Sequence, residues 1–171
     1  MQELWAQAPK IRLERQLWIA VMRAQQELGI AIPVGVPEKY EAVMDTVNLE
    51  SIAERERVTK HDVKARIEEF NDLAGAEYIH LGMTSRDLTE NVEQLQIRLS
   101  LILIRDKSVA ALDRLSGLAI AFSELAMAGR SHNVAAQITT LGKRMATFAE
   151  ELLFAVDRLE ELIAAYPLRG I

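Results

Sequence analysis

The feature that most constrains this chain is a stretch of apolar side chains at helical spacing, from residue 86 to residue 166, that contains no proline. In its first part the apolar residues step by four and three, as in a coiled-coil seam: Leu88, Val92, Leu95, Leu99 and Ile102. A helix from about residue 86 to about residue 128 would be roughly 60 Å long, at ~1.5 Å per residue. Other apolar residues lie off this seam: Leu101, Ile104, Leu115, Leu118 and Phe122. A helix that is apolar on several faces must be surrounded by other helices.

A second long helix is predicted after the segment AGRSHNVAAQ, residues 128–137. Its apolar residues keep a strict alternation of four and three: Leu141, Met145, Phe148, Leu152, Ala155, Leu159, Leu162 and Tyr166. Two long helices joined by a short break form an antiparallel pair, and a pair cannot bury this much apolar surface alone. We therefore expect an all-α fold in which more chain or more subunits cover the pair.

Shorter helices with polar joints are predicted in the first part of the chain. The first helix ends at Gly29, and Pro37 suits the first turn of a short second helix. Asn48 is the predicted N-cap of a third helix, and a fourth runs from a candidate cap at Thr59 to a stop at Gly75.

Two domains follow from this pattern. Residues 1–83 are predicted to form a small N-terminal helical domain, and residues 84–171 the first, incomplete part of a central long-helix bundle. No segment carries a convincing strand signal, although residues 78–81 are a weak candidate for an extended segment.

Composition excludes several classes of function. The chain has no cysteine, which removes disulfides, thiolate nucleophiles and zinc–thiolate sites. Its net charge is −5 with both signs interspersed, so no basic face for nucleic acid is expected. The N-terminus is too charged for a signal peptide, and no run reaches the ~18 apolar residues of a membrane span. We expect a soluble, cytoplasmic protein.

All three histidines lie at joints between predicted helices. Lys60, His61 and Asp62 stand together at a helix start, where the lysine and the helix N-terminus could hold an anion and Asp62 could fix the tautomer of the imidazole. The alternative is a solvated helix start with Asp62 as a favourable N-terminal charge, and for this segment alone it is the preferred interpretation.

The second histidine, His80, leads into HLGMTSRD. Thr84 and Ser85 place two hydroxyls at the start of the longest helix, where hydroxyls and backbone N–H groups can bind a carboxylate or a phosphate. The alternative is an ordinary N-cap, with Thr84 and Asp87 forming a variant of the capping box.

The third histidine lies in GRSH, which is harder to explain structurally. Arg130 can neutralise an anion, Ser131 can bond a carboxylate oxygen, and His132 titrates near neutral pH, as a general acid should. A zinc site made of the three histidines is not expected, because no HExxH or similar ligand spacing is present, and we predict no metal.

Three segments in order, KHDVKARIEEFN, HLGMTSRDLTEN and AGRSHNVAAQITTLGKRMA, resemble the adenylosuccinate lyases of the fumarase/aspartase superfamily, especially their actinobacterial form. The resemblance covers nearly the whole chain. It implies an all-helical enzyme without a cofactor, whose central bundle forms a homotetramer and whose active sites are built from three subunits. It also implies β-elimination of fumarate from adenylosuccinate, giving AMP, and from the succinylated carboxamide intermediate of purine biosynthesis (SAICAR), giving AICAR.

The resemblance also implies roles for eight residues. His132 corresponds to the general acid of the family, and Ser131, which stands where the family usually has Thr, would bond a succinyl carboxylate. The remaining positions match substrate-binding residues: Lys60, His61, Asp62, His80, Thr84 and Ser85. Lys60 replaces the commoner Arg, which keeps the charge but loses the bidentate geometry.

Two family segments have no match in this sequence: an N-terminal Arg-Tyr phosphate contact and the later serine loop, SSxMPxKxNP, that supplies the base. We therefore expect an N-terminal portion of the enzyme that is inactive alone. Two alternatives stay open: another lyase of the superfamily, such as argininosuccinate lyase or a carboxymuconate cycloisomerase, and a helical oligomerisation module without catalysis.

Overall fold

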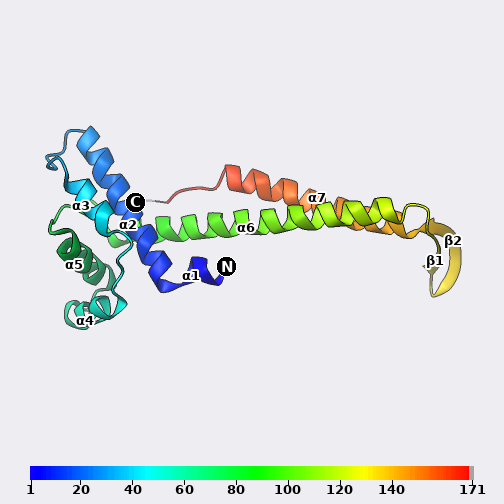
Figure 1. Ribbon diagram of the computed structural model, residues 1–171, viewed down its shortest axis with the longest axis horizontal. Coiled ribbons are helices and arrows are strands. Elements are labelled where there is room, and N and C mark those ends of the chain that lie inside the picture. Colours follow the sequence, from blue (N-terminus) through cyan, green and yellow to red (C-terminus); the bar gives the residue numbers. More distant parts are fainter. Residues whose placement is uncertain (170–171) are drawn as a thin grey trace. The chain divides into compact units, whose positions relative to one another are not determined.

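The computed structural model describes residues 1–169 and contains seven helices and two short strands in this range (Figure 1). The helices of the first half are α1 (Gln2–Trp5), α2 (Gln7–Glu27), α3 (Val36–Val43), α4 (Leu49–Thr59) and α5 (Asp62–Ala74). The second half holds α6 (Ser85–Ala121), β1 (Ala126–Ser131), β2 (Val134–Thr140) and α7 (Leu141–Ala164). The fold class is all-α, as predicted, with one small hairpin that the sequence analysis did not predict. No helix in the described range is long and apolar enough to cross a membrane.

The chain divides into two compact units inside α6. Unit 1 comprises Met1–Ile97 and the C-terminal segment that begins at Pro167, and unit 2 comprises Arg98–Tyr166. The predicted domain boundary after residue 83 stays a prediction. The two glycine-independent helix starts were placed well by local chemistry, since Asn48 Oδ1 accepts a hydrogen bond from Ser51 N at 3.0 Å and Pro37 lies in the first turn of α3.

Two local predictions in unit 1 need correction. Thr59 is the last residue of α4 and not the cap of α5; the N-cap is His61, whose side chain accepts a hydrogen bond from Lys64 N. Residues 78–81 do not form a strand. Gly75 ends α5 in the left-handed conformation, as predicted.

The core of unit 1 is aromatic. Trp18 of α2, Tyr40 of α3 and Phe70 of α5 are almost completely buried, and Phe70 packs against both of the other rings. Arg15 lies within this core with its guanidinium 4.4 Å from the centre of the Phe70 ring and forms a buried ion pair with Glu69. The same guanidinium donates to three carbonyls of the α3–α4 loop, so α2, α5 and this loop are joined by one side chain.

Unit 2 is an antiparallel pair of helices joined by the hairpin. Near one end of the pair, Gly142 N donates to the Phe122 carbonyl at 2.8 Å, and near the other, Arg98 Nε donates to the Ile163 carbonyl at 3.2 Å. α6 ends at Ala121, so the predicted end near residue 128 was wrong: part of that segment forms β1.

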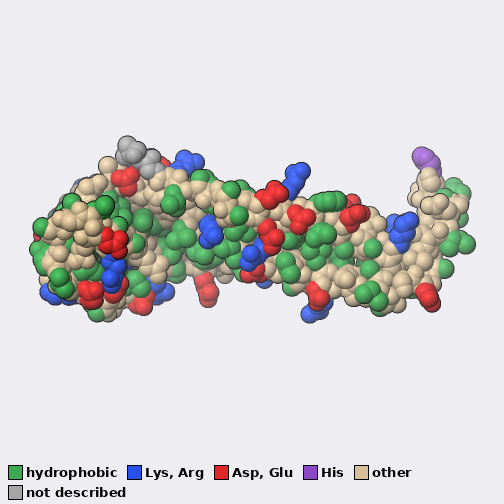
Figure 2. All heavy atoms as spheres, turned by 90° about the horizontal axis from the view of Figure 1, so that it is seen from above, with side chains coloured by type: hydrophobic (Ala, Val, Ile, Leu, Met, Phe, Trp, Pro, Cys, Tyr) green, Lys and Arg blue, Asp and Glu red, His purple; other side chains and the backbone are tan. Residues whose placement is uncertain are grey.

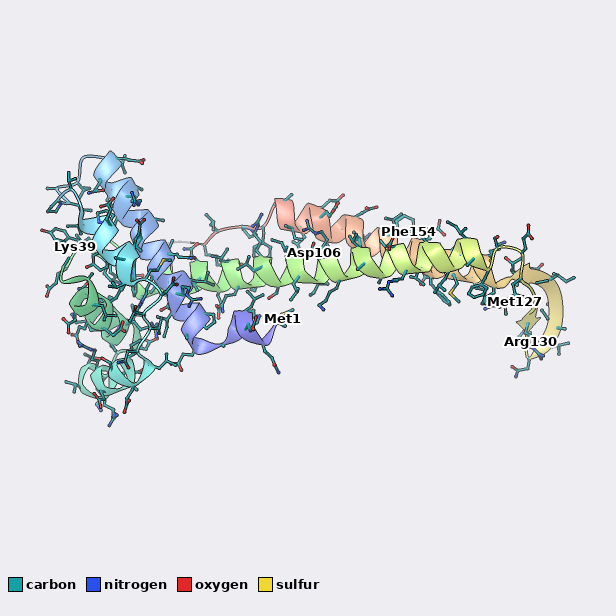
Figure 3. The ribbon with its side chains drawn as sticks, viewed as in Figure 1. Met1, Lys39, Asp106, Met127, Arg130 and Phe154 are labelled. Atoms are coloured by element: carbon teal, nitrogen blue, oxygen red, sulfur yellow. The ribbon has the colours of Figure 1, made fainter. Side chains whose placement is uncertain are left out.

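Little of the apolar surface of unit 2 is buried within it. Val156 and Ile163 are its only large apolar side chains in the buried class among the described residues. Phe154, labelled in Figure 3, is 63% exposed, and Ile120 is 74% exposed. Figure 2 shows hydrophobic side chains at the surface along the helices, between scattered charges. This confirms the expectation that the pair does not bury its own apolar surface.

Candidate functional site

The segment Lys60–Asp62 joins α4 to α5. Lys60 ends α4 in the left-handed conformation, with φ 53°, which is unusual for a residue with a side chain. His61 Nδ1 accepts a hydrogen bond from Lys64 N at 3.3 Å. In the neutral ring the proton is therefore on Nε2, which leaves that nitrogen as a donor.

Asp62 is held as an anion. Burial alone would raise its pKa, but the Val63 backbone N–H and the Arg66 guanidinium, which donates to Oδ2 at 2.9 Å, together lower that pKa below its ordinary value. Arg66 is held in turn by Glu14 of α2, with 2.6 Å between Arg66 Nε and Glu14 Oε2. The buried Glu14 thus anchors the guanidinium that positions the Asp62 carboxylate.

His80 lies in the α5–α6 connection, also in the left-handed conformation, with φ 64°. The indole N–H of Trp18 donates to His80 Nδ1 at 3.0 Å, and the two rings are nearly perpendicular. Burial lowers the pKa of His80; Asp87 opposes this shift, while His61 adds to it. The charges of His61 and Asp87 both reach His80, so the KHD and HLGMTSRD segments lie together in unit 1.

Thr84 and Ser85 lie at the start of α6, beside His80. Thr84 N donates to Asp87 Oδ2 at 2.8 Å, which confirms the carboxylate half of the predicted capping box. We call the six predicted residues of this unit the unit 1 cluster: Lys60, His61, Asp62, His80, Thr84 and Ser85.

GRSH forms the tip of the β1–β2 hairpin. Ser131 pairs with Val134, and the two residues between them, His132 and Asn133, have φ of 52° and 64°. Two consecutive left-handed residues are the signature of a type I′ turn, whose twist matches that of paired strands. Arg130 turns back to this tip, donating to the Asn133 carbonyl at 3.0 Å. His132 is therefore displayed on a tight turn and is exposed to solvent.

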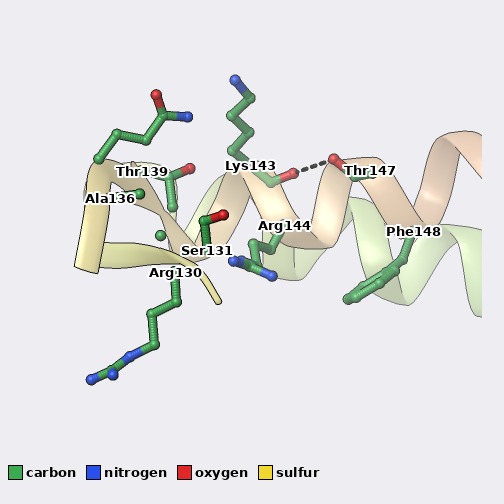
Figure 4. A pocket seen from close by; sticks show the side chains of 10 residues that line it. Arg130, Ser131, Ala136, Thr139, Lys143, Arg144, Thr147 and Phe148 are labelled. Atoms are coloured by element: carbon green, nitrogen blue, oxygen red, sulfur yellow. Dashed lines mark hydrogen bonds between the residues drawn. The ribbon is translucent and has the colours of Figure 1, made fainter. Parts of the chain in front are cut away.

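A pocket of about 380 Å³ lies between the hairpin and the first turns of α7 (Figure 4). Its lining includes three cationic side chains, Arg130, Lys143 and Arg144, and no carboxylate. Hydroxyl groups and one aromatic ring complete its wall: Ser131, Thr139, Thr147 and Phe148. The pocket contains Ser131 but is not lined by His132.

The sequence analysis missed Lys143 and Arg144. The available signal was their position, because two adjacent cations directly after a helix start oppose the helix dipole, and no acidic residue of the first turn compensates them. The structure thus groups the predicted residues as the unit 1 cluster and, in unit 2, the hairpin residues Ser131 and His132. No group of three or more potential metal ligands occurs within residues 1–169.

Fold and site together define a helix-rich protein that displays histidines, hydroxyls and cations at the joints between its helices. The family described as Lyase matches residues 12–170. The chain belongs to this lyase family.

The relatives agree with this assignment. The chain is 34% identical over 166 residues to an adenylosuccinate lyase of Methanocaldococcus jannaschii, covering 94% of this chain and 36% of that protein. It is 31% identical over 163 residues to an adenylosuccinate lyase of Saccharomyces cerevisiae, covering 92% of this chain and 34% of that protein. The chain therefore spans about a third of the length of these curated relatives.

Solved structures share the fold. The crystal structure of a fumarate lyase from Mesorhizobium sp. BNC1 superimposes with a TM-score of 0.84 at 26% identity, covering 99% of this chain and 42% of that one. A 3-carboxy-cis,cis-muconate lactonizing enzyme from Pseudomonas putida has a TM-score of 0.80 at 24% identity, covering 94% of this chain and 38% of that one, and shows the fold alone.

Proposed function

We propose that the chain is part of an adenylosuccinate lyase that releases fumarate from adenylosuccinate and from SAICAR by β-elimination. One observation carries the proposal beyond the family assignment. The non-glycine residues with positive φ in the described range are Lys60, His80, His132 and Asn133, and each lies in one of the three segments whose residue types suggest chemistry. Such conformations cost free energy and concentrate where function requires a particular display of side chains.

The reaction assigns a task to each group. A base removes the proton next to a carboxylate, the electron pair moves into that carboxylate as an aci-carboxylate, and the C–N bond then breaks as the leaving nitrogen takes a proton. We assign the proton donor to His132, which stands exposed on its turn. The base is not assigned to any of the eight residues.

The other seven residues are proposed to bind substrate. Ser131 would donate to a succinyl carboxylate, and the Thr84 and Ser85 hydroxyls at the α6 N-terminus would bind the other end of the dicarboxylate. Lys60 supplies positive charge, His61 a fixed Nε2 donor and His80 a second imidazole, while the Asp62 carboxylate stabilises the His61 side chain, 3.6 Å away.

Full-length protein with His132→Ala tests this proposal. We expect loss of fumarate release, followed by ultraviolet absorbance, of about 10²-fold or more, the usual contribution of a general acid. Asn133→Gly, which keeps the left-handed turn, is the matched control and should retain activity. Full activity in His132→Ala would refute the role of His132, and turnover of argininosuccinate but not of adenylosuccinate would refute the substrate assignment.

The proposed enzyme is a homo-oligomer, a tetramer at full length. The exposed apolar side chains of unit 2 support this, since surfaces of this kind are normally covered by a partner. Sedimentation velocity of the 171-residue chain should show self-association that increases with concentration; a monomer at all concentrations would contradict it.

A further inference from the structure

The pocket between the hairpin and α7 has the composition of an oxyanion site. Three cationic side chains line it without a carboxylate, and three hydroxyl-bearing residues, Ser131, Thr139 and Thr147, lie in the same wall. Hydroxyls and cations together are the groups that bind carboxylates and phosphates in proteins.

Lys143 and Arg144 are the cations available for a ligand. Arg130 donates to the Asn133 carbonyl, whereas the side chains of Lys143 and Arg144 have no ion pair or hydrogen bond with any residue in the range 1–169. By contrast, Arg15, Arg55 and Arg66 of unit 1 each pair with a carboxylate. The positive charge of the pocket is therefore unbalanced within the described chain.

The hydroxyls are unequal. Thr147 Oγ1 donates to the Lys143 carbonyl at 3.1 Å, the dashed line in Figure 4, so it can offer only its lone pairs to a ligand. Ser131 is on the hairpin edge of the pocket, and Figure 4 shows its hydroxyl and the guanidinium of Arg144 in the same part of the view. The donors to an anion are thus the Ser131 hydroxyl, Arg144 and Lys143.

We propose that this pocket binds an oxyanion group of the substrate, with Arg144 and Lys143 as its positive charges and Ser131 as its hydroxyl donor. Ser131 belongs to both, so the proposal deepens the proposed function. The ring of Phe148 and the methyl of Ala136 form an apolar part of the wall, which favours a carboxylate on a carbon chain over a bare phosphate.

Titration calorimetry on the full 171-residue chain tests the proposal without requiring turnover. Fumarate and inorganic phosphate are titrated separately, with ionic strength held constant by potassium chloride. We expect saturable binding of one anion per chain, weakened about tenfold or more in Lys143→Gln/Arg144→Gln and less in Ser131→Ala. Lys107→Gln/Arg114→Gln removes the same two charges from exposed positions of α6 and should bind like the wild type.

The two probes separate the sources of the anion. Tighter fumarate binding supports a carboxylate subsite, and tighter phosphate binding supports an oxyanion site but overturns the carboxylate assignment. No saturable binding of either, or equal loss in both double variants, overturns the proposal, provided circular dichroism shows unchanged helix content. A lyase-inactive full-length protein that still binds fumarate here would sink the proposed function and leave the site.

Discussion

The ion pair between Glu14 and Arg66 makes the strongest prediction about stability. The Glu14 side chain is 1% exposed and that of Arg66 13%, with 2.6 Å between Oε2 and Nε. Glu14 Oε1 has no hydrogen-bond partner within residues 1–169. Arg66 is therefore the main compensation for a buried carboxylate, and its removal leaves that charge uncompensated.

The magnitude follows from burial. Removing one partner of a buried ion pair costs about 3–5 kcal/mol, because the remaining charge is left in a medium of low polarity. The pair of Arg66 with the half-exposed Asp62 adds at most about 1 kcal/mol. Arg66→Met should thus lower the free energy of unfolding by about 3–5 kcal/mol, a large part of the ~5–15 kcal/mol typical of a whole domain.

Urea unfolding followed by tryptophan fluorescence is the appropriate assay. Both tryptophans, Trp5 and Trp18, belong to unit 1, so the signal reports on the unit that holds the ion pair. The double variant Glu14→Gln/Arg66→Met removes the buried charge along with its partner and should recover much of the loss.

The pH dependence gives a second check. Burial raises the pKa of Glu14, and Arg66 is the largest influence that lowers it, so Arg66→Met raises it further. A folded state that takes up a proton more readily than the unfolded chain gains stability as the pH falls. The deficit of Arg66→Met should therefore shrink between about pH 8 and pH 5. A loss below about 1 kcal/mol, with no dependence on pH, would refute the reasoning, since that is the range of an exposed pair.

Four further predictions concern single positions. Gly142→Ala should destabilise unit 2 by about 1–3 kcal/mol or more in thermal unfolding, because the added Cβ would lie 2.7 Å from the backbone of Phe122; an unchanged melting temperature would contradict that close approach. Asn48→Ala should cost about 1 kcal/mol in urea unfolding, whereas Asn48→Ser should cost little. The lowered pKa of His80 means that the folded state resists its protonation, so its contribution to stability is full above the ordinary value of about 6.5 and is lost as the pH falls below it; a histidine ring titrating by NMR above that value would disprove this. Lys60→Gly should be about 1 kcal/mol more stable than Lys60→Ala, because glycine adopts φ 53° without strain; equal stabilities would remove the argument from strain.

The sequence predicted those features that depend on neighbouring residues. The cap at Asn48, the proline at the start of α3 and the stop at Gly75 each act within one helical turn, so their chemistry is visible in a short window. The long helices were equally clear, because their apolar spacing repeats many times.

The hairpin could not be predicted in this way. α6 ends where no glycine or proline marks a stop, and the carbonyls of Phe122 and Leu125 accept hydrogen bonds from Gly142 and Leu141, far along the chain. The strands are rich in alanine, which has no preference for a strand, and only Asn133 is typical of the turn between them. The end of α6 is thus set by the return of the chain, which a local pattern does not contain.

Residue types alone predicted the candidate site, but the backbone supplies a reason to group its parts. Lysine and histidine have no intrinsic preference for the left-handed region, yet Lys60, His80 and His132 all adopt it, one in each predicted segment. Each conformation is stabilised by what surrounds it: His80 by the indole N–H of Trp18, and the turn at His132 by the pairing of Ser131 with Val134. Because a glycine would relieve this strain at no steric cost, the retention of functional side chains at these three positions is best explained by the chemistry they display.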